Sequence, residues 1–119
     1  MEQTIPKREF KTTSKTFDTD IEEQLQFSVE EKLDLIATGV TLIVTGDEKF
    51  ALGEFSYIAN TIASKLDFIH SDSNLCIKVE IDTGYNIGER RIIIRPLTQE
   101  DRDEDSIIIW SANFYKYRL

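Results

Sequence analysis

Close to its C-terminal end the sequence has one dense acidic run, Glu-Asp-Arg-Asp-Glu-Asp. Its Asp101, Asp103 and Asp105 match the first three ligand positions of an EF-hand loop, where carboxylate oxygens bind Ca²⁺. The match fails further on, because Ser106 stands where a glycine makes the sharp turn and Ala112 where a bidentate glutamate is needed. We therefore predict no metal site and interpret the run as a solvated acidic loop. Its three aspartates are candidate partner-binding residues, either for a basic protein or as a mimic of phosphate charge.

The chain has one histidine, His70, and one cysteine, Cys76. His70 ends a predicted helix, where the helix dipole favours the charged imidazolium over the neutral base. One Cys and one His are too few for a zinc site, and no phosphate-binding glycine loop or nucleophile motif is present. We therefore predict no catalytic residue, no cofactor and no enzyme activity. A small enzyme or ligand-binding domain without a recognisable motif remains the alternative.

The last residues combine aromatic and cationic side chains: Trp110, Tyr115, Tyr117 and Arg118. These residue types are enriched in the energetic centres of protein interfaces, so we predict that they bind a partner. Their strand is apolar on both faces and must be covered on both sides. The helices would cover one side, and the N-terminal arm, a second copy or a partner the other. Nucleic-acid stacking would also use such residues, but the net charge of −8 disfavours it.

Two helices are predicted to position these residues. Ile21, Leu25, Val29, Leu33 and Ile36 recur every three or four residues and line one helix face. A capping box begins the secure part of this helix, residues 29–38, at a serine followed three residues later by a glutamate (28 and 31). The segment 21–27 is either part of the same helix or a separate turn.

The second helix carries a longer apolar stripe that runs from Ala51 to Leu66. It starts either near Asp47, which the stripe favours, or near Gly53. A short β-branched strand over 40–45 precedes it.

The segments 75–82 and 89–95 are predicted to form a hairpin. Alternation of apolar and polar residues places Val79 opposite Ile92, and Glu80 opposite Arg91. With the last strand, the predicted order is arm-α-β-α-β-β-β. The predicted class is α+β, with two helices on one face of a mostly antiparallel sheet of three or four strands.

The composition predicts a flexible basic arm over residues 1–17 and a single domain over 18–119. No signal peptide and no membrane-spanning run is visible, and a lone cysteine excludes an internal disulfide, so we expect a cytoplasmic protein. Taken together, we predict a non-catalytic protein-interaction domain, a small acidic regulator, inhibitor or adaptor. It would bind a protein partner through the outer sheet face and the acidic loop. The alternative is a self-assembling structural subunit.

Overall fold

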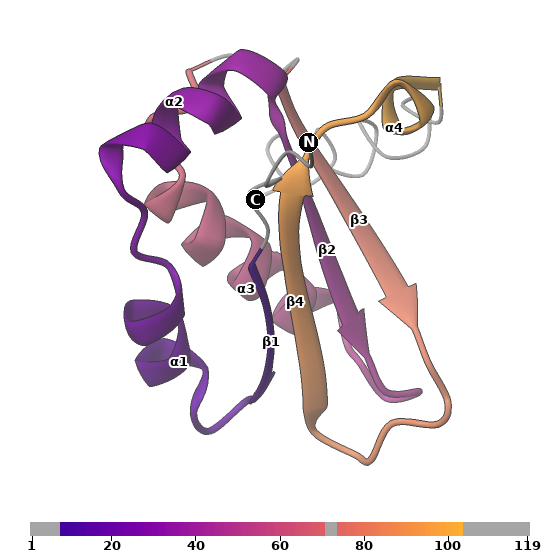
Figure 1. Ribbon diagram of the computed structural model, residues 1–119. Helices are drawn as coiled ribbons and strands as arrows, with labels where there is room; N and C mark the ends of the chain where they lie inside the picture. Colours follow the sequence, from indigo (N-terminus) through magenta and orange to yellow (C-terminus); the bar gives the residue numbers. More distant parts are fainter. Residues whose placement is uncertain (1–7, 71–73, 104–119) are drawn as a thin grey trace, which may run out of the picture.

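The computed structural model describes residues 8–70 and 74–103, and for Arg102 and Asp103 the backbone alone (Figure 1). These residues form four helices and four strands, which confirms the predicted α+β class. In chain order the elements are β1 (Arg8–Thr13), α1 (Phe17–Gln24), α2 (Val29–Thr38), β2 (Val40–Gly46), α3 (Leu52–Lys65), β3 (Leu75–Ile81), β4 (Glu89–Pro96) and α4 (Gln99–Asp103).

The four strands form one mixed sheet in the order β1-β4-β2-β3. β4 pairs antiparallel with both β1 and β2, while β2 and β3 run parallel. β2 is buried at every residue, as a β-branched strand covered on both faces should be. The helix α3 supplies the crossover that a parallel pair requires.

The predicted hairpin of residues 75–82 and 89–95 is wrong, because β2 lies between the two strands. Val44 of β2 is opposite Val79 on one side and opposite Ile92 on the other. Val79 and Ile92 therefore lie at the predicted level of the sheet without being neighbours. Alternation determines the face and level of a residue, but it carries no information about which strand is adjacent.

Part of the segment predicted as a flexible arm is an edge strand. Arg8–Thr13 forms β1 on the free edge of β4, with Phe10 opposite Ile92 and Thr12 opposite Arg90. Phe10 and Thr12 are buried while their neighbours Glu9 and Lys11 are exposed. This period-two burial shows why the segment is ordered, although its composition is polar. Residues 1–7 of the predicted arm lie outside the described part of the chain.

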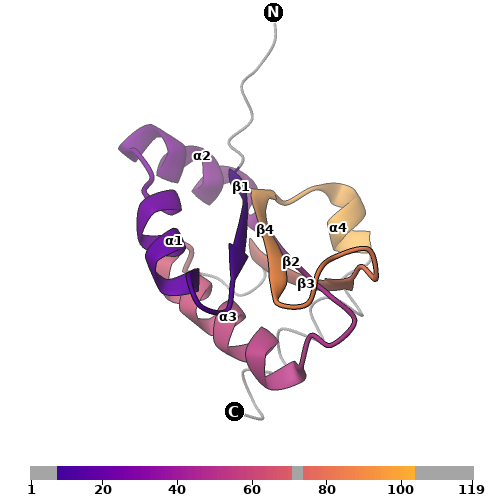
Figure 2. The same cartoon turned by 90° about the horizontal axis from the view of Figure 1, so that it is seen from below.

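Three helices, α1, α2 and α3, cover one face of the sheet, and α4 lies on the other side (Figures 1 and 2). The prediction of two helices on that face is corrected to three because the first predicted helix is divided in two. The core between helices and sheet contains Leu42 and Val44 from β2 and Phe55 and Ile62 from α3. Of the two predicted starts of α3, the structure favours the later one, since the helix begins at Leu52.

The division between α1 and α2 decides which apolar residues are covered. The chain leaves helical geometry after Gln24 and re-enters it at Val29. Ile21 and Leu25 remain in the core, but Val29, Leu33 and Ile36 face solvent. Of the two alternatives for residues 21–27, the structure favours a segment separate from α2, so the five apolar residues do not share one face, since a helical phase is lost when the helix is interrupted.

Candidate interaction surface

Three large apolar side chains form an exposed stripe along α2. Val29 is 73% exposed, Leu33 60% and Ile36 43%. Their spacing of four and three residues places them on one side of the helix over two turns, about 10 Å. We call these three residues the α2 stripe.

The orientation of α2 is set at both of its ends. Ser28 accepts a hydrogen bond from the amide of Glu31 at 3.1 Å, and the Glu31 carboxylate accepts one from the amide of Ser28 at 2.9 Å. This is the predicted capping box, and it satisfies two amides at the helix start. Gly39 ends the helix with a positive φ of 83° and donates its amide to Leu35 O at 2.7 Å. With Leu35 turned into the core as the one buried residue of α2, the stripe must face away from it.

Arg8 of β1 fastens the start of α2 to the sheet. Its guanidinium contacts the Glu31 carboxylate at 2.8 Å and lies 5.0 Å from the centre of the Phe27 ring. The Ser28 amide and the Arg8 guanidinium together hold the pKa of the Glu31 carboxyl below its usual value, against partial burial. The edge strand β1 therefore positions the helix that carries the stripe.

The two borders of the stripe differ in character. Toward the core, the Lys32 ammonium lies 5.8 Å from the centre of the Phe68 ring, and Phe68 packs edge-to-face on Phe27. On the other border, Glu30 and Asp34 are exposed and one turn apart. Within the described part of the chain, neither carboxylate forms an ion pair. The stripe thus has an aromatic border and an acidic border.

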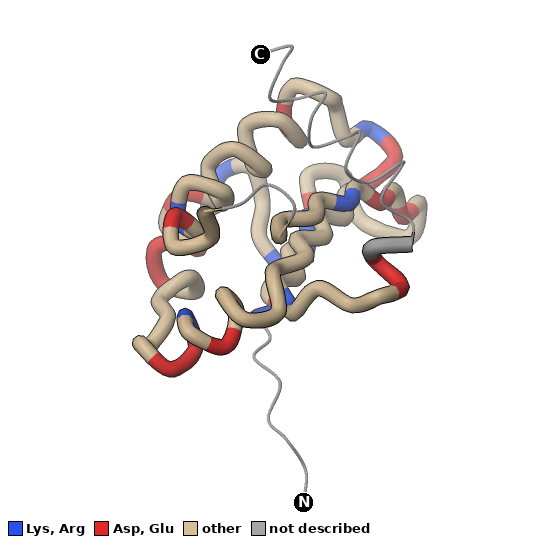
Figure 3. The backbone as a smooth tube through the Cα atoms, turned by 90° about the horizontal axis from the view of Figure 1, so that it is seen from above, with Lys and Arg blue, Asp and Glu red and all other residues tan. Residues whose placement is uncertain are grey.

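The segment from α1 to the end of α2 accounts for most of the net negative charge of the protein. Residues 17–38 contain seven acidic side chains and one lysine, a net −6 of the total −8; Figure 3 marks these positions along the backbone. Four of the seven have partners within the fold. Asp18 accepts from the Tyr57 hydroxyl, Asp20 from Thr12 and Thr16, Glu22 from Lys65, and Glu31 from Arg8.

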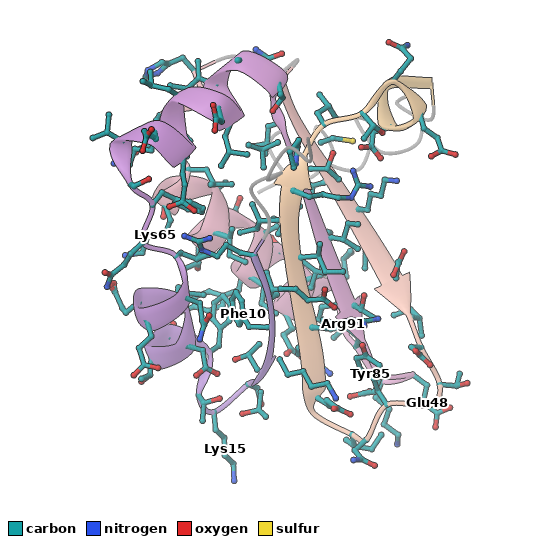
Figure 4. The ribbon with its side chains drawn as sticks, in the orientation of Figure 1. Phe10, Lys15, Glu48, Lys65, Tyr85 and Arg91 are labelled. Atoms are coloured by element: carbon teal, nitrogen blue, oxygen red, sulfur yellow. The ribbon has the colours of Figure 1, made fainter. Side chains whose placement is uncertain are left out.

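The Lys65–Glu22 pair, at 2.6 Å, shows how these internal partners hold the helices together; Figure 4 labels Lys65 at the end of α3. The pair joins the end of α3 to α1 across the surface of the helical layer. The remaining acidic residues, Glu23, Glu30 and Asp34, are exposed. Their charge is directed to solvent rather than to the fold.

Asp101, one of the predicted partner-binding residues, is buried inside the protein. It is 1% exposed. The carboxylate accepts hydrogen bonds from Arg95 at 2.7 and 3.0 Å and from the Thr41 hydroxyl at 2.9 Å, and it forms an ion pair with Lys78 at 2.8 Å. Burial raises the pKa of its carboxyl, but the hydrogen bonds from Arg95 and Lys78 outweigh it and hold the pKa well below the usual range. This carboxylate attaches α4 to the outer sheet face and is not presented to a partner.

The other predicted site residues are not brought together by the described structure. Asp103 ends α4, and its side chain is not described. The remaining five, Asp105, Trp110, Tyr115, Tyr117 and Arg118, lie outside the described residues. Their role in partner binding stays a prediction.

A second buried ion-pair cluster, not predicted from the sequence, lies at the start of α3. Arg90 forms two hydrogen bonds with Glu54, at 2.8 and 2.7 Å, and one with Asp47 at 2.6 Å. The Arg90 guanidinium, assisted by the Gly88 amide, lowers the pKa of the Asp47 carboxyl from 3.8 to about 2. All of these groups are satisfied by one another, so the cluster is structural. The sequence does contain a signal of this cluster: Arg90 stands on the apolar side of an alternating strand, two residues before Ile92, where a buried charge needs a partner.

The two residues considered for catalysis differ in their exposure to solvent. His70 is exposed, whereas Cys76 is buried on β3. Among residues 8–70 and 74–103 no group of three His, Cys, Asp or Glu side chains could hold a metal ion.

A cavity of about 480 Å³ lies between the β1–α1 and β3–β4 loops and is lined by Thr13, Ser14, Lys15 and residues 86–89. No helix in the described residues is long and apolar enough to cross a membrane.

No family model matches this chain, and no curated protein matches it. Several solved structures are similar to it at a low level, among them two of FtsZ. A mutant of FtsZ from M. jannaschii is 19% identical with a TM-score of 0.46, and the match covers 79% of this chain and 28% of that chain. An empty FtsZ dimer from M. jannaschii is 20% identical with a TM-score of 0.46, over 79% and 27% of the two chains. This chain spans less than a third of those proteins, and the likeness carries no statement about its function.

Proposed function

We propose that this chain is a non-catalytic protein-interaction domain, a small acidic regulator, inhibitor or adaptor, that binds a protein partner through the α2 stripe. The observation that supports the proposal is the exposure of Val29, Leu33 and Ile36 at helical spacing. Single exposed apolar residues are common on soluble proteins, but an ordered apolar row typically marks a surface that another molecule covers.

The stripe has the form of a helix-in-groove recognition element. Partners of this kind read anchors at positions i, i+4 and i+7 of an amphipathic helix. The capping box, Gly39 and Arg8 hold α2 in place before binding, so little ordering entropy remains to oppose association.

The proposal moves the main interaction surface away from the outer sheet face and acidic loop. Asp101 of that loop is committed to Arg95 and Lys78. A contribution of Trp110, Tyr115, Tyr117 and Arg118 remains a separate prediction. It is tested by replacing Tyr115 and Tyr117 with alanine and measuring partner recovery and solution mass.

The chain offers a matched pair of leucines to test the stripe. Leu33 is 60% exposed on α2, and Leu52 is 59% exposed at the start of α3. We expect tagged wild type and Leu52→Glu to recover the same protein from host extract, and Leu33→Glu to lose it. The recovered protein, once purified, should bind wild type saturably in isothermal titration calorimetry and bind Leu33→Glu at least about tenfold more weakly.

Two results would overturn the proposal. One is a partner whose affinity is the same for Leu33→Glu and wild type while circular dichroism shows both folded. The other is the absence of any Leu33-dependent protein together with a solution mass unchanged by the substitution. A mass that falls on substitution would instead support the self-assembling subunit.

A further inference from the structure

We infer that the partner presents a basic amphipathic helix, which lies along α2 with its apolar side on the stripe and its Lys or Arg side chains beside Glu30 and Asp34. This inference rests on the proposed function and adds the chemistry of the partner. It is carried by the position, along one border of an apolar row, of two exposed carboxylates that form no ion pair with any other described residue.

Helix geometry places these carboxylates where a partner would meet them. Glu30 follows Val29 and Asp34 follows Leu33, so both lie on the same side of the stripe and one turn apart. The other border is closed by Lys32 over the Phe68 ring. A docked helix would therefore have acidic groups along one of its sides only, which determines both its charge and its direction.

The wider charge of this layer has the same sign. Residues 17–38 carry a net −6, and Glu23 on α1 is also exposed. Such a field increases the association rate of cationic partners and repels anionic ones. Exposed carboxylates at the rim add modest affinity, while the apolar row supplies most of the binding energy.

The same charges disfavour two other occupants. A second copy docked antiparallel on the stripe would bring Glu30 and Asp34 of both chains to the same side, and in any orientation each chain carries a net charge of −8. An anionic membrane surface favours lysine-rich polar faces and would be repelled by this layer. A protein helix with lysines or arginines satisfies both the apolar row and its acidic border.

The inference is testable with two synthetic peptides of about 18 residues, five helical turns. Both carry leucines at helical spacing; one has lysines beside the leucines, and the other has glutamates. Binding of the fluorescein-labelled peptides to the full chain is followed by fluorescence anisotropy at low and at physiological salt.

Two matched pairs of variants accompany wild type. Leu33→Glu is compared with Leu52→Glu, which have equal exposure. The double variant Glu30→Lys/Asp34→Lys is compared with Glu48→Lys/Glu100→Lys, which changes the net charge equally at exposed sites away from α2 (Figures 1 and 4). Circular dichroism checks the fold, and Val29→Ser replaces Leu33→Glu if the latter unfolds.

The expected result is binding of the lysine peptide to wild type and both controls. Leu33→Glu should weaken it at least about tenfold, and Glu30→Lys/Asp34→Lys about threefold or more. The double variant should in turn gain binding of the glutamate peptide.

Other results would overturn the inference. Equal binding of both peptides, lost in Leu33→Glu, would refute the charge preference and leave the proposed function standing. Equal binding of the lysine peptide to all variants would indicate a non-specific attraction to an acidic protein. No binding of either peptide would refute the helical partner, as would a Leu33-dependent dimer in sedimentation or binding to anionic vesicles.

Discussion

Helices α2 and α3 are both amphipathic, yet they use their apolar residues differently. α3 buries Phe55, Ile58, Ala59 and Ile62, whereas α2 buries Leu35 alone and exposes its three other large apolar residues. The comparison shows that helical periodicity identifies an apolar face but does not say what covers it. In α3 the sheet covers that face, and in α2 we propose that a partner does.

The two helices also differ in how their N-terminal ends are held. α3 begins beside the buried Arg90, which forms two hydrogen bonds to Glu54 in its first turn. α2 begins at the exposed capping box of Ser28 and Glu31. Both anchors contain an ion pair, but the Arg90–Asp47 pair of α3 is buried and the Arg8–Glu31 pair of α2 is partly exposed, so the anchor of α3 should respond more strongly to pH and to substitution.

The largest effect is expected from one substitution made on both helices. Ile62→Ala in α3 removes a fully buried side chain and should lower the free energy of unfolding by about 2–5 kcal/mol. Ile36→Ala in α2 removes a side chain that is half exposed and should cost less than about 1 kcal/mol. Urea unfolding measures both. Similar costs would mean that the exposed face of α2 is covered in solution, and the comparison would fail.

The next effect concerns the charged anchor of α3. The pKa of Asp47 lies below its unfolded value, from 3.8 to about 2, so the anchor is complete above pH of about 3.8. Its contribution should be lost as the pH falls toward about 2, because the folded state must then take up a proton that the unfolded state already holds. We expect the melting temperature of wild type to fall across this range and that of Asp47→Asn to fall less steeply. An NMR titration of the Asp47 carboxyl with a midpoint close to 3.8 would contradict the assignment.

A smaller effect is expected at the start of α2. Ser28→Ala removes the acceptor for the Glu31 amide and should cost about 1 kcal/mol. Ser64→Ala, at an exposed position in α3, is the control and should change stability by less than about 0.5 kcal/mol. Chemical denaturation separates the two. If Ser28→Ala left the free energy of unfolding unchanged, Arg8 rather than the capping box would hold the start of the helix.

The smallest effect on stability, combined with a loss of binding, is expected for Leu33→Ser. The side chain is exposed, so the free energy of unfolding should change by less than about 0.5 kcal/mol and the melting temperature should change little. Partner affinity should nevertheless fall severalfold. A variant that loses stability and keeps its partner would reverse the roles assigned to Leu33 and Leu35.

Features that depend on neighbouring residues were predicted well from the sequence. The capping box of Ser28, the range 29–38 of α2 and the core face of α3 all follow from contacts within one or two helical turns. The levels of Val79 and Ile92 in the sheet were also correct, because the alternation is a property of each strand alone.

Features that depend on distant segments were not predictable in the same way. The insertion of β2 between β3 and β4, and the pairing of β1 with β4, join residues far apart in the chain. The partners of Arg90, Asp47 and Glu54, are 43 and 36 residues away from it. The exposure of the α2 stripe follows from the break in the helix before Ser28, which the capping box allowed as one of two alternatives but the periodicity across 21–36 could not decide.

Two arginines of β4, the buried Arg90 and the half-buried Arg95, have a consequence for the alignment of the sheet. Arg90 points to the helical face and Arg95 to the opposite face, and each meets a buried aspartate there. If β4 slid by one residue, both guanidiniums would change faces, leaving the buried Asp47 without its cation and Asp101 with Lys78 alone. The two ion pairs, one on each face, therefore allow this isoleucine-rich strand a single register between β1 and β2.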